Sequence, residues 1–222
     1  MSKLLFDAQT TLVDSVAGEA ALAPERLTSA WLREHFAEPR HWLPETINEP
    51  LLNAELAAAM PAAVLIAIVA REEGLTLLFT QRTAHLTDHA GQVSFPGGRV
   101  EASDASPTET ALRETEEEIG LSRQHVEVLG ILPDYFTATG YRVTPVVALV
   151  HPPFELQADP HEVAEIFEVP LSFLMDGLNH QRRTAEFPDG GRRSFYAMPY
   201  DRFFIWGATA GMLRNLFHFL RA

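Results

Sequence analysis

The sequence predicts an α/β fold with a mixed β-sheet, and three features of the chain lead to this expectation. An apolar, β-branched run at residues 62–70 is followed by a turn at 72–74 and a returning run at 75–82, a pattern typical of a buried hairpin. A segment at 107–119 has apolar side chains at helical spacing, and strand-like runs follow it at 126–132 and 142–150. Strands and helices that alternate around one apolar core indicate an α/β or α+β architecture.

The remaining elements lie at the two ends of the chain. The first 60 residues hold two stretches of helix-forming composition that Pro39, Pro44 and Pro50 interrupt. We therefore expect a helical N-terminal extension at 1–60, which packs on the main domain or dimerises, and a main domain at 61–222. Near the C-terminus, residues 184–200 predict a hairpin with its turn at 188–191, and residues 206–220 predict a closing helix.

Composition and charge exclude several classes of protein. The 222-residue chain carries a net charge of −13, which argues against non-specific binding to nucleic acid. It has no cysteine, so neither disulfides nor thiolate metal sites can form. The most apolar run, at 56–70, is interrupted by Pro61 and is shorter than the roughly 20 residues that span a bilayer. We expect a cytoplasmic protein with no membrane or nucleic-acid partner, and a homodimer is left open.

The helix at 107–119 has sequence signals at both ends. Ser106 is a good N-cap, Pro107 occupies the first helical position, and Glu109 would complete a capping box. Gly120 is expected to end the helix. On a helical wheel, one buried stripe contains Ala111, Leu112, Thr115 and Ile119.

Carboxylates crowd the last turns of this helix. Glu114 and Glu118 are four residues apart and Glu117 lies beside them, so the three share one edge, whereas Glu116 points toward Arg113 and Glu109. The helix dipole disfavours negative charge at this end, so an external cation is expected to neutralise the cluster. Carboxylate oxygens suit Mg²⁺, Mn²⁺ or Ca²⁺. A solvated acidic face is the alternative.

The loop at 95–98, Phe-Pro-Gly-Gly, brings a bare backbone toward these carboxylates and completes a longer pattern. The segment from Gly98 to Leu121 resembles the Nudix box, and its matching residues are Gly98, Arg113, Glu114, Glu117, Glu118, Gly120 and Leu121. Three departures accompany the match. The isolated acid is Asp104 instead of Glu, it lies one residue further from the Arg, and Thr115 fills an apolar position.

A second motif lies directly upstream. The longer box and the segment at 78–98 resemble the coenzyme A diphosphatase subfamily, with matches at Leu78, Thr80, Arg82, Gly91 and 95–98. Thr83 replaces a small Ser or Ala, and Thr87 stands where the subfamily has a second Arg, which removes a bidentate phosphate donor.

The resemblance implies a Nudix-type α/β/α sandwich and a metal-dependent hydrolase of a diphosphate linked to a nucleoside. By this resemblance Glu114, Glu117 and Glu118 are catalytic and, with the Gly98 carbonyl, bind Mg²⁺ or Mn²⁺. Arg82, Gly97 and Gly98 are expected to bind substrate, and Arg113 is expected to pair with Asp104 or a helix glutamate.

The subfamily resemblance also implies a substrate. Coenzyme A or its derivatives would be cleaved to 3′,5′-ADP and 4′-phosphopantetheine. The alternatives are another nucleoside diphosphate derivative, such as ADP-ribose or a dinucleotide, and a Nudix-like nucleotide-binding regulatory module without turnover.

Three further groups of residues have possible functional roles that the sequence leaves open. Glu162 is a candidate metal ligand or general base, or else a carboxylate at a helix start without a catalytic role. Tyr135, Phe136 and Tyr141 could stack on a base or line a channel. Four arginines around the predicted C-terminal turn, expected to be exposed, could bind a remote phosphate or form a solvated sheet edge: Arg182, Arg183, Arg192 and Arg193.

Overall fold

The main sheet of the protein is mixed, as the sequence predicts. The computed structural model describes residues 7–45, 58–85, 90–186 and 191–222. The central strands run in the order β4 (Val93–Ser94), β3 (Gly74–Arg82), β2 (Met60–Arg71), β8 (Tyr141–Val150) and β6 (Val126–Ile131). Three further strands join at the sides: β5 (Gly97–Arg99) pairs with β2, β7 (Tyr135–Phe136) with β8, and β9 (Val163–Pro170) with β3. Strands β2 and β8 are parallel, and β2 and β3 form the predicted antiparallel hairpin.

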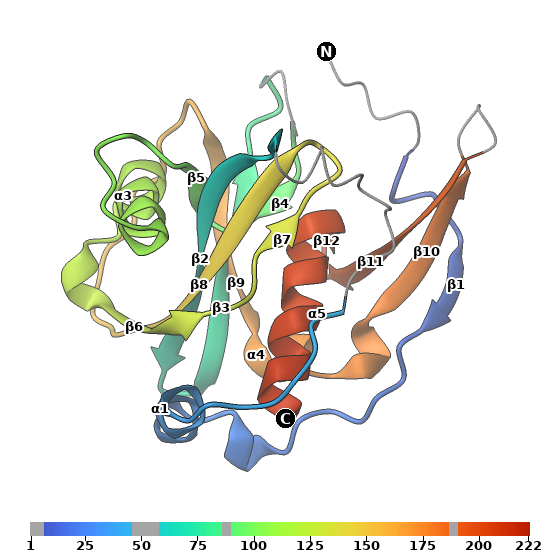
Figure 1. The fold of residues 1–222 in the computed structure, drawn as a ribbon, viewed down its shortest axis with the longest axis horizontal. Helices are drawn as coiled ribbons and strands as arrows, with labels where there is room; N and C mark the ends of the chain where they lie inside the picture. The colour runs from blue at the N-terminus through green and yellow to red at the C-terminus, as the bar shows by residue number, and fades with distance from the viewer. Residues whose placement is uncertain (1–6, 46–57, 86–89, 187–190) are drawn as a thin grey trace.

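Strand β2 is buried on both faces, which explains its uninterrupted apolar sequence. Ala63 and Leu65 lie in the core beneath α3 (Pro107–Ile119), whereas Ile66 and Ile68 lie in the core beneath α5 (Gly207–Arg221). Figure 1 shows α3 and α5 on opposite sides of the sheet. The fold is therefore an α/β/α sandwich.

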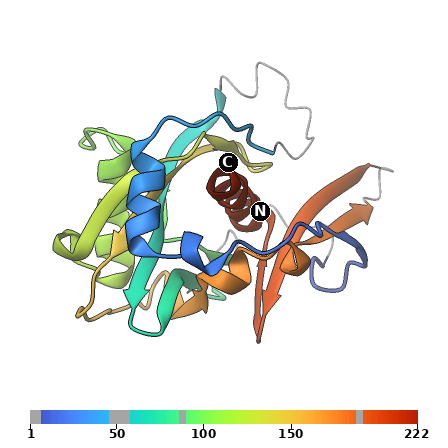
Figure 2. The same cartoon turned by 90° about the horizontal axis from the view of Figure 1, so that it is seen from below.

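A second, four-stranded sheet packs on the far side of α5. Its order is β1 (Val13–Val16), β10 (Gln181–Glu186), β11 (Arg192–Tyr200) and β12 (Phe203–Trp206). Figure 2 looks along α5 and shows this helix between the two sheets. The β10–β11 pair is the predicted C-terminal hairpin, although its turn at 187–190 lies outside the described residues.

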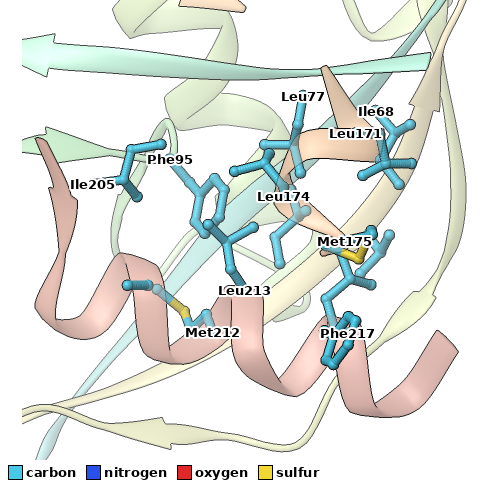
Figure 3. Close-up of a cluster of buried hydrophobic side chains, with 14 of the residues drawn as sticks. Ile68, Leu77, Phe95, Leu171, Leu174, Met175, Ile205, Met212, Leu213 and Phe217 are labelled. Carbon is cyan, nitrogen blue, oxygen red and sulfur yellow. The ribbon is translucent and has the colours of Figure 1, made fainter. Parts of the chain in front are cut away.

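Helix α5 carries much of the larger core. Leu213 and Phe217 point toward Phe95, Leu174 and Met175 (Figure 3). The short helix α4 (Leu171–Leu174) and the 3₁₀ turn η3 (Gly177–Asn179) lead from β9 into the second sheet. Another 3₁₀ turn, η2 (Arg123–His125), joins α3 to β6. No helix in the described ranges has the length and apolar character needed to cross a membrane.

The N-terminal extension contains both helix and strand. The 3₁₀ turn η1 (Pro24–Arg26) and helix α1 (Ser29–Ala37) lie in the first predicted helical stretch, and Thr28 caps α1 by accepting from the Trp31 amide. Strand β1 was not predicted; it pairs with β10 through a register shift between Val13 and Ser15. The second helical stretch, at 51–60, falls almost entirely outside the described residues.

Candidate active site

Helix α3 has the predicted ends but not the complete capping box. The Ser106 Oγ accepts from the Glu109 amide at 3.3 Å, and Gly120 ends the helix in a left-handed conformation with φ of 68°. The Glu109 carboxylate instead contacts Arg123, which also binds Glu116. The expectation that Glu116 points toward Glu109 is therefore confirmed, because Arg123 binds both carboxylates. The Arg113 guanidinium instead binds Asp104, Glu114 and Glu117.

The buried face of α3 includes one of the acidic residues. Ala111, Thr115 and Ile119 are buried as expected, and Glu118 is only 5% exposed. Glu117, one position earlier, has an exposed side chain. The helix thus carries Glu118 into the protein and leaves Glu117 at the surface.

The two glycines before α3 allow the backbone to approach these carboxylates. Gly97 has φ of +150°, and a Cβ there would lie 2.4 Å from the Ala63 carbonyl oxygen. Its amide donates to Glu118 Oε2 at 3.2 Å. A Cβ on Gly98 would lie 2.5 Å from the Glu114 carboxylate. The loop and the helix therefore meet at Glu114 and Glu118. A Cβ on Gly97 would clash with backbone, whereas a Cβ on Gly98 would clash with the end of the Glu114 side chain.

Glu118 is a buried carboxylate, and few hydrogen bonds or positive charges offset the cost of burying its charge. Burial raises its pKa to about 8, and the nearby charges of Glu162 and Glu114 act in the same direction. The Gly97 amide and Arg82, whose Nη1 lies 3.9 Å from Glu118 Oε1, oppose this rise. Burial and the neighbouring acids also raise the pKa of Glu114. A cation would stabilise the charged forms of both residues.

Arg113 holds the loop and the helix together. Its Nε and Nη2 donate to the two Asp104 oxygens at 2.9 and 3.0 Å, so the expected pairing with Asp104 is confirmed. This ion pair holds the pKa of Asp104 well below its usual range. Arg113 Nη1 donates to Glu114 and Glu117 at 3.0 Å each. The longer spacing between the isolated acid and the Arg therefore still allows contact.

The four predicted acidic residues lie around one site but do not form a complete cation cage. Glu162 immediately precedes β9, where its carbonyl accepts from the Thr83 amide at 2.9 Å, and its charge raises the pKa of both Glu114 and Glu118. In the described ranges, no three acidic or histidine side chains already converge closely enough to hold a metal. The donors nevertheless fit a hard cation, because Glu114, Glu118 and the bare Gly98 backbone adjoin one another.

Arg82 presents an unused donor to the same site. It ends β3, on the face of the sheet that carries Glu118, and its buried Nε has no hydrogen-bond partner among the described residues. A buried N–H without an acceptor is unfavourable, so an oxygen from a ligand would stabilise it. Thr87, which replaces the second subfamily Arg, lies outside the described residues.

The hairpin arginines differ from the expectation of four exposed side chains. Arg183 is 8% exposed and donates to the carbonyls of Ala8, Gln9 and Thr11, so it anchors the N-terminal segment. Its predicted exposure is wrong, because residues 8–11 cover that face of the hairpin.

The sequence did not single out Arg99, which follows Gly98. Its Nε and Nη2 donate to the Tyr141 hydroxyl at 3.0 and 2.6 Å. The only sequence signal for this pair was the position of Arg99 beside the glycines.

Comparisons with known proteins agree with this geometry. The NUDIX domain family matches residues 60–187. The uncharacterized Nudix hydrolase NudL of Escherichia coli K12 is 42% identical over 167 residues, which cover 75% of this chain and 86% of that protein. NudL of Citrobacter koseri matches to the same extent, at 42% over 167 residues with 75% and 86% covered. A solved Ap4A hydrolase complex from C. elegans has a TM-score of 0.44 at 22% identity over 50% of this chain and 80% of that chain, a likeness too weak to support an argument.

Proposed function

The chain belongs to the Nudix hydrolase family, and within it we propose that the protein cleaves the diphosphate of coenzyme A or its derivatives. As a family member it is a hydrolase acting on acid anhydrides. The proposed products are 3′,5′-ADP and 4′-phosphopantetheine, or its acyl form. The proposal for the substrate rests on the subfamily motif at 78–98.

The observation that supports the chemistry best is the buried Glu118 beside Gly97 and Gly98. A carboxylate that is 5% exposed, with its pKa raised to about 8, needs positive charge to remain ionised. We propose that Glu114, Glu118 and the Gly98 carbonyl hold Mg²⁺ or Mn²⁺, with Glu117 in support. Such a divalent cation neutralises diphosphate oxygens and lowers the pKa of an attacking water.

The other residues of the chain are proposed to position substrate and protons. The buried Arg82 Nε donates to a diphosphate oxygen, which satisfies this free N–H. The amides and carbonyls around Gly97 and Gly98 let the substrate approach the backbone. Glu162 is exposed at the rim of the site, where it accepts a proton from the attacking water. Arg113 keeps Glu114 and Glu117 in place through its bond to Asp104.

One observation favours a second candidate substrate. Thr87 lacks the guanidinium that the subfamily has at this position, so selectivity for a phosphate-rich substrate such as coenzyme A is weaker. ADP-ribose or a dinucleotide is the alternative. The cytoplasmic location, the possible homodimer and the domain boundary near residue 60 stay predictions.

A substrate panel tests the proposal. Turnover of coenzyme A, 3′-dephospho-coenzyme A and ADP-ribose would be compared with Mg²⁺ and with Mn²⁺, and products would be resolved by chromatography. Preferred cleavage of coenzyme A to 3′,5′-ADP is the expected result. Equal or faster turnover of ADP-ribose would reject the coenzyme A substrate and retain the diphosphatase.

Two matched variants of α3 test the assigned chemistry. Glu118→Gln keeps the shape of the buried side chain and removes its charge, so kcat should fall by about 100-fold or more. Glu116→Gln changes a carboxylate that binds Arg123 outside the site, and its kcat should stay within about threefold of wild type. Equal activity of the two variants would remove Glu118 from the catalytic set.

A further inference from the structure

The pair formed by Arg99 and Tyr141 differs from three other arginine pairs of the protein that are formed with a carboxylate. Arg99 directs Nε and Nη2 at one phenol oxygen, at 3.0 and 2.6 Å. The same two nitrogens of three other arginines contact both oxygens of a carboxylate: Arg33 with Glu127, Arg71 with Glu168, and Arg113 with Asp104. The Arg99 fork therefore faces a neutral acceptor where these three face an anion. Arg183 also directs the same two nitrogens at a neutral oxygen, that of Gln181, but its side chain is buried, whereas Arg99 is exposed.

The charge of Arg99 has no anionic partner in the part of the chain that the structure describes. Its guanidinium carbon also lies 5.4 Å from the centroid of the Tyr141 ring. The side chain is exposed, so it can accept a new partner without unfolding the loop. A planar guanidinium fork matches the oxygens of a phosphate, which would supply the missing negative charge.

Arg99 directly follows Gly98 in β5, next to the candidate catalytic site. Gly98 pairs with Ala63, in the core beneath α3, and Arg99 pairs with Ala62, in the core beneath α5. Successive residues of a strand face opposite sides of a sheet, so the Arg99 side chain leaves β5 on the α5 side, whereas Gly98 faces Glu114 and Glu118 on the α3 side. Its backbone is also fixed, because its carbonyl accepts from Arg113 Nη2 at 3.2 Å.

We infer that Arg99 binds a phosphate of the nucleotide substrate, with Tyr141 holding the guanidinium in place beforehand. This subsite rests on the proposed diphosphatase function, and the phosphate belongs either to the diphosphate itself or to the 3′ position of the ribose. In either case Arg99 contributes affinity from the α5 side of the sheet while the acidic residues act from the α3 side.

Arg99→Ala tests the subsite, and Arg142→Ala is its matched control. Arg142 is another exposed arginine, one residue from Tyr141, and its Nε lies 3.6 Å from the Asp134 carboxylate. Arg99→Ala should raise KM by about tenfold or more with kcat changed less than about threefold, whereas Arg142→Ala should leave both near wild type. An increase for both coenzyme A and 3′-dephospho-coenzyme A identifies the diphosphate as the ligand, and an increase for coenzyme A alone identifies the 3′-phosphate.

Binding of ADP and of 3′,5′-ADP, measured by calorimetry with Mg²⁺, separates this inference from the proposed function. In Arg99→Ala the affinity should fall by about tenfold for ADP if Arg99 binds the diphosphate, or for 3′,5′-ADP if it binds the 3′-phosphate. In Tyr141→Phe, which keeps the cation and the ring, both affinities should fall by less than about threefold. Unchanged affinity for both nucleotides and unchanged KM in Arg99→Ala would overturn the subsite. A wild-type protein that turns over none of the three substrates would overturn the proposed function, and the two binding measurements would still decide on Arg99.

Discussion

The neighbouring glycines Gly97 and Gly98 have different roles, although both belong to the same sequence motif. A Cβ on Gly97 would meet fixed backbone, 2.4 Å from the Ala63 carbonyl oxygen and 2.6 Å from the Val64 Cα. A Cβ on Gly98 would meet only the end of the Glu114 side chain, at 2.5 Å. The first glycine is thus required by the fold and the second by the position of a proposed metal ligand.

Alanine substitutions should separate these two roles. Gly97→Ala introduces a backbone clash and a strained positive φ, and should lower the free energy of unfolding by roughly 2–4 kcal/mol. Gly98→Ala should lower it by less than about 1 kcal/mol, because Glu114 can rotate away, but kcat/KM should fall at least about tenfold. Urea unfolding and steady-state kinetics on the two variants measure both effects. Equal losses of stability would contradict the distinction.

The sequence predicted which acidic residues belong to the candidate site, but not which of them are buried or which groups contact them. The spacing of Glu114, Glu117 and Glu118 placed them along one edge of a helix. It could not show that Glu118 is buried and Glu117 exposed, because that difference depends on a loop about 20 residues upstream that closes over one side of the helix. The partnership of Arg99 with Tyr141 was equally hidden, since it joins β5 and β8 across β2.

At the scale of single elements, the first turn of α3 fixes the position of the helix. It thereby places the glutamates of α3 beside the loop that carries Gly97 and Gly98. Ser106 Oγ accepts from the Glu109 amide, and Asp104 accepts from Thr110 Oγ1 just inside the helix. These bonds satisfy N–H and O–H groups that the helix alone leaves free at its start. The N-terminus of α3 is therefore fixed to the same loop that carries Gly97 and Gly98.

Ser106→Ala should lower the free energy of unfolding by about 1 kcal/mol, because it removes the side-chain cap. Ser122→Ala is the matched control, since Ser122 precedes η2 without making a side-chain cap bond, and its change should stay within about 0.5 kcal/mol. Chemical denaturation of the two variants gives the comparison. If Ser122→Ala were as destabilising as Ser106→Ala, the cap would not be the cause.

Across the whole molecule, the sequence predicted the sandwich more fully than the extension. The periodic patterns of β2, β3, α3, β6, β8 and α5 predicted these elements, because each buries a face that its own residues define. Their arrangement as a sandwich was predicted by the family resemblance. Strand β1 has four exposed residues and no apolar face to bury, so nothing in its local pattern marked it as a strand. It forms because β10 offers an edge and Arg183 holds residues 8–11 beside it.

The extension is fastened to the main domain by a buried arginine of α5. Arg214 is 3% exposed, and its Nη2 lies 2.9 Å from carboxylate oxygens of both Glu19 and Glu45. Burial alone would raise the pKa of Glu45, but hydrogen bonds from His218, Tyr196 and Arg214 lower it from 4.5 to about 2. The folded protein therefore holds the Glu45 proton less tightly than the unfolded chain does.

This difference predicts how stability depends on pH. Because the folded pKa is below the unfolded value, the contribution of Glu45 is complete above about pH 4.5 and is lost as the pH falls toward about 2. With allowance for solvent screening of a side chain that is 33% exposed, we expect a loss of about 1–2 kcal/mol across this window. Glu45→Gln removes the titrating group, so its unfolding free energy should fall less steeply between pH 5 and pH 3 than that of wild type.

The pH dependence of the unfolding free energy, compared between variants, tests the ion pair between Arg214 and Glu45. Glu25→Gln provides the control, because Glu25 belongs to the same extension and is exposed in the turn η1, and its slope should match wild type. A Glu45→Gln slope equal to wild type would show that Glu45 is not held by Arg214 in solution. A shallower slope would show that the ion pair between Glu45 and Arg214 forms in solution and holds the extension on α5. This ion pair lies on the side of α5 that faces the second sheet, away from the proposed catalytic residues.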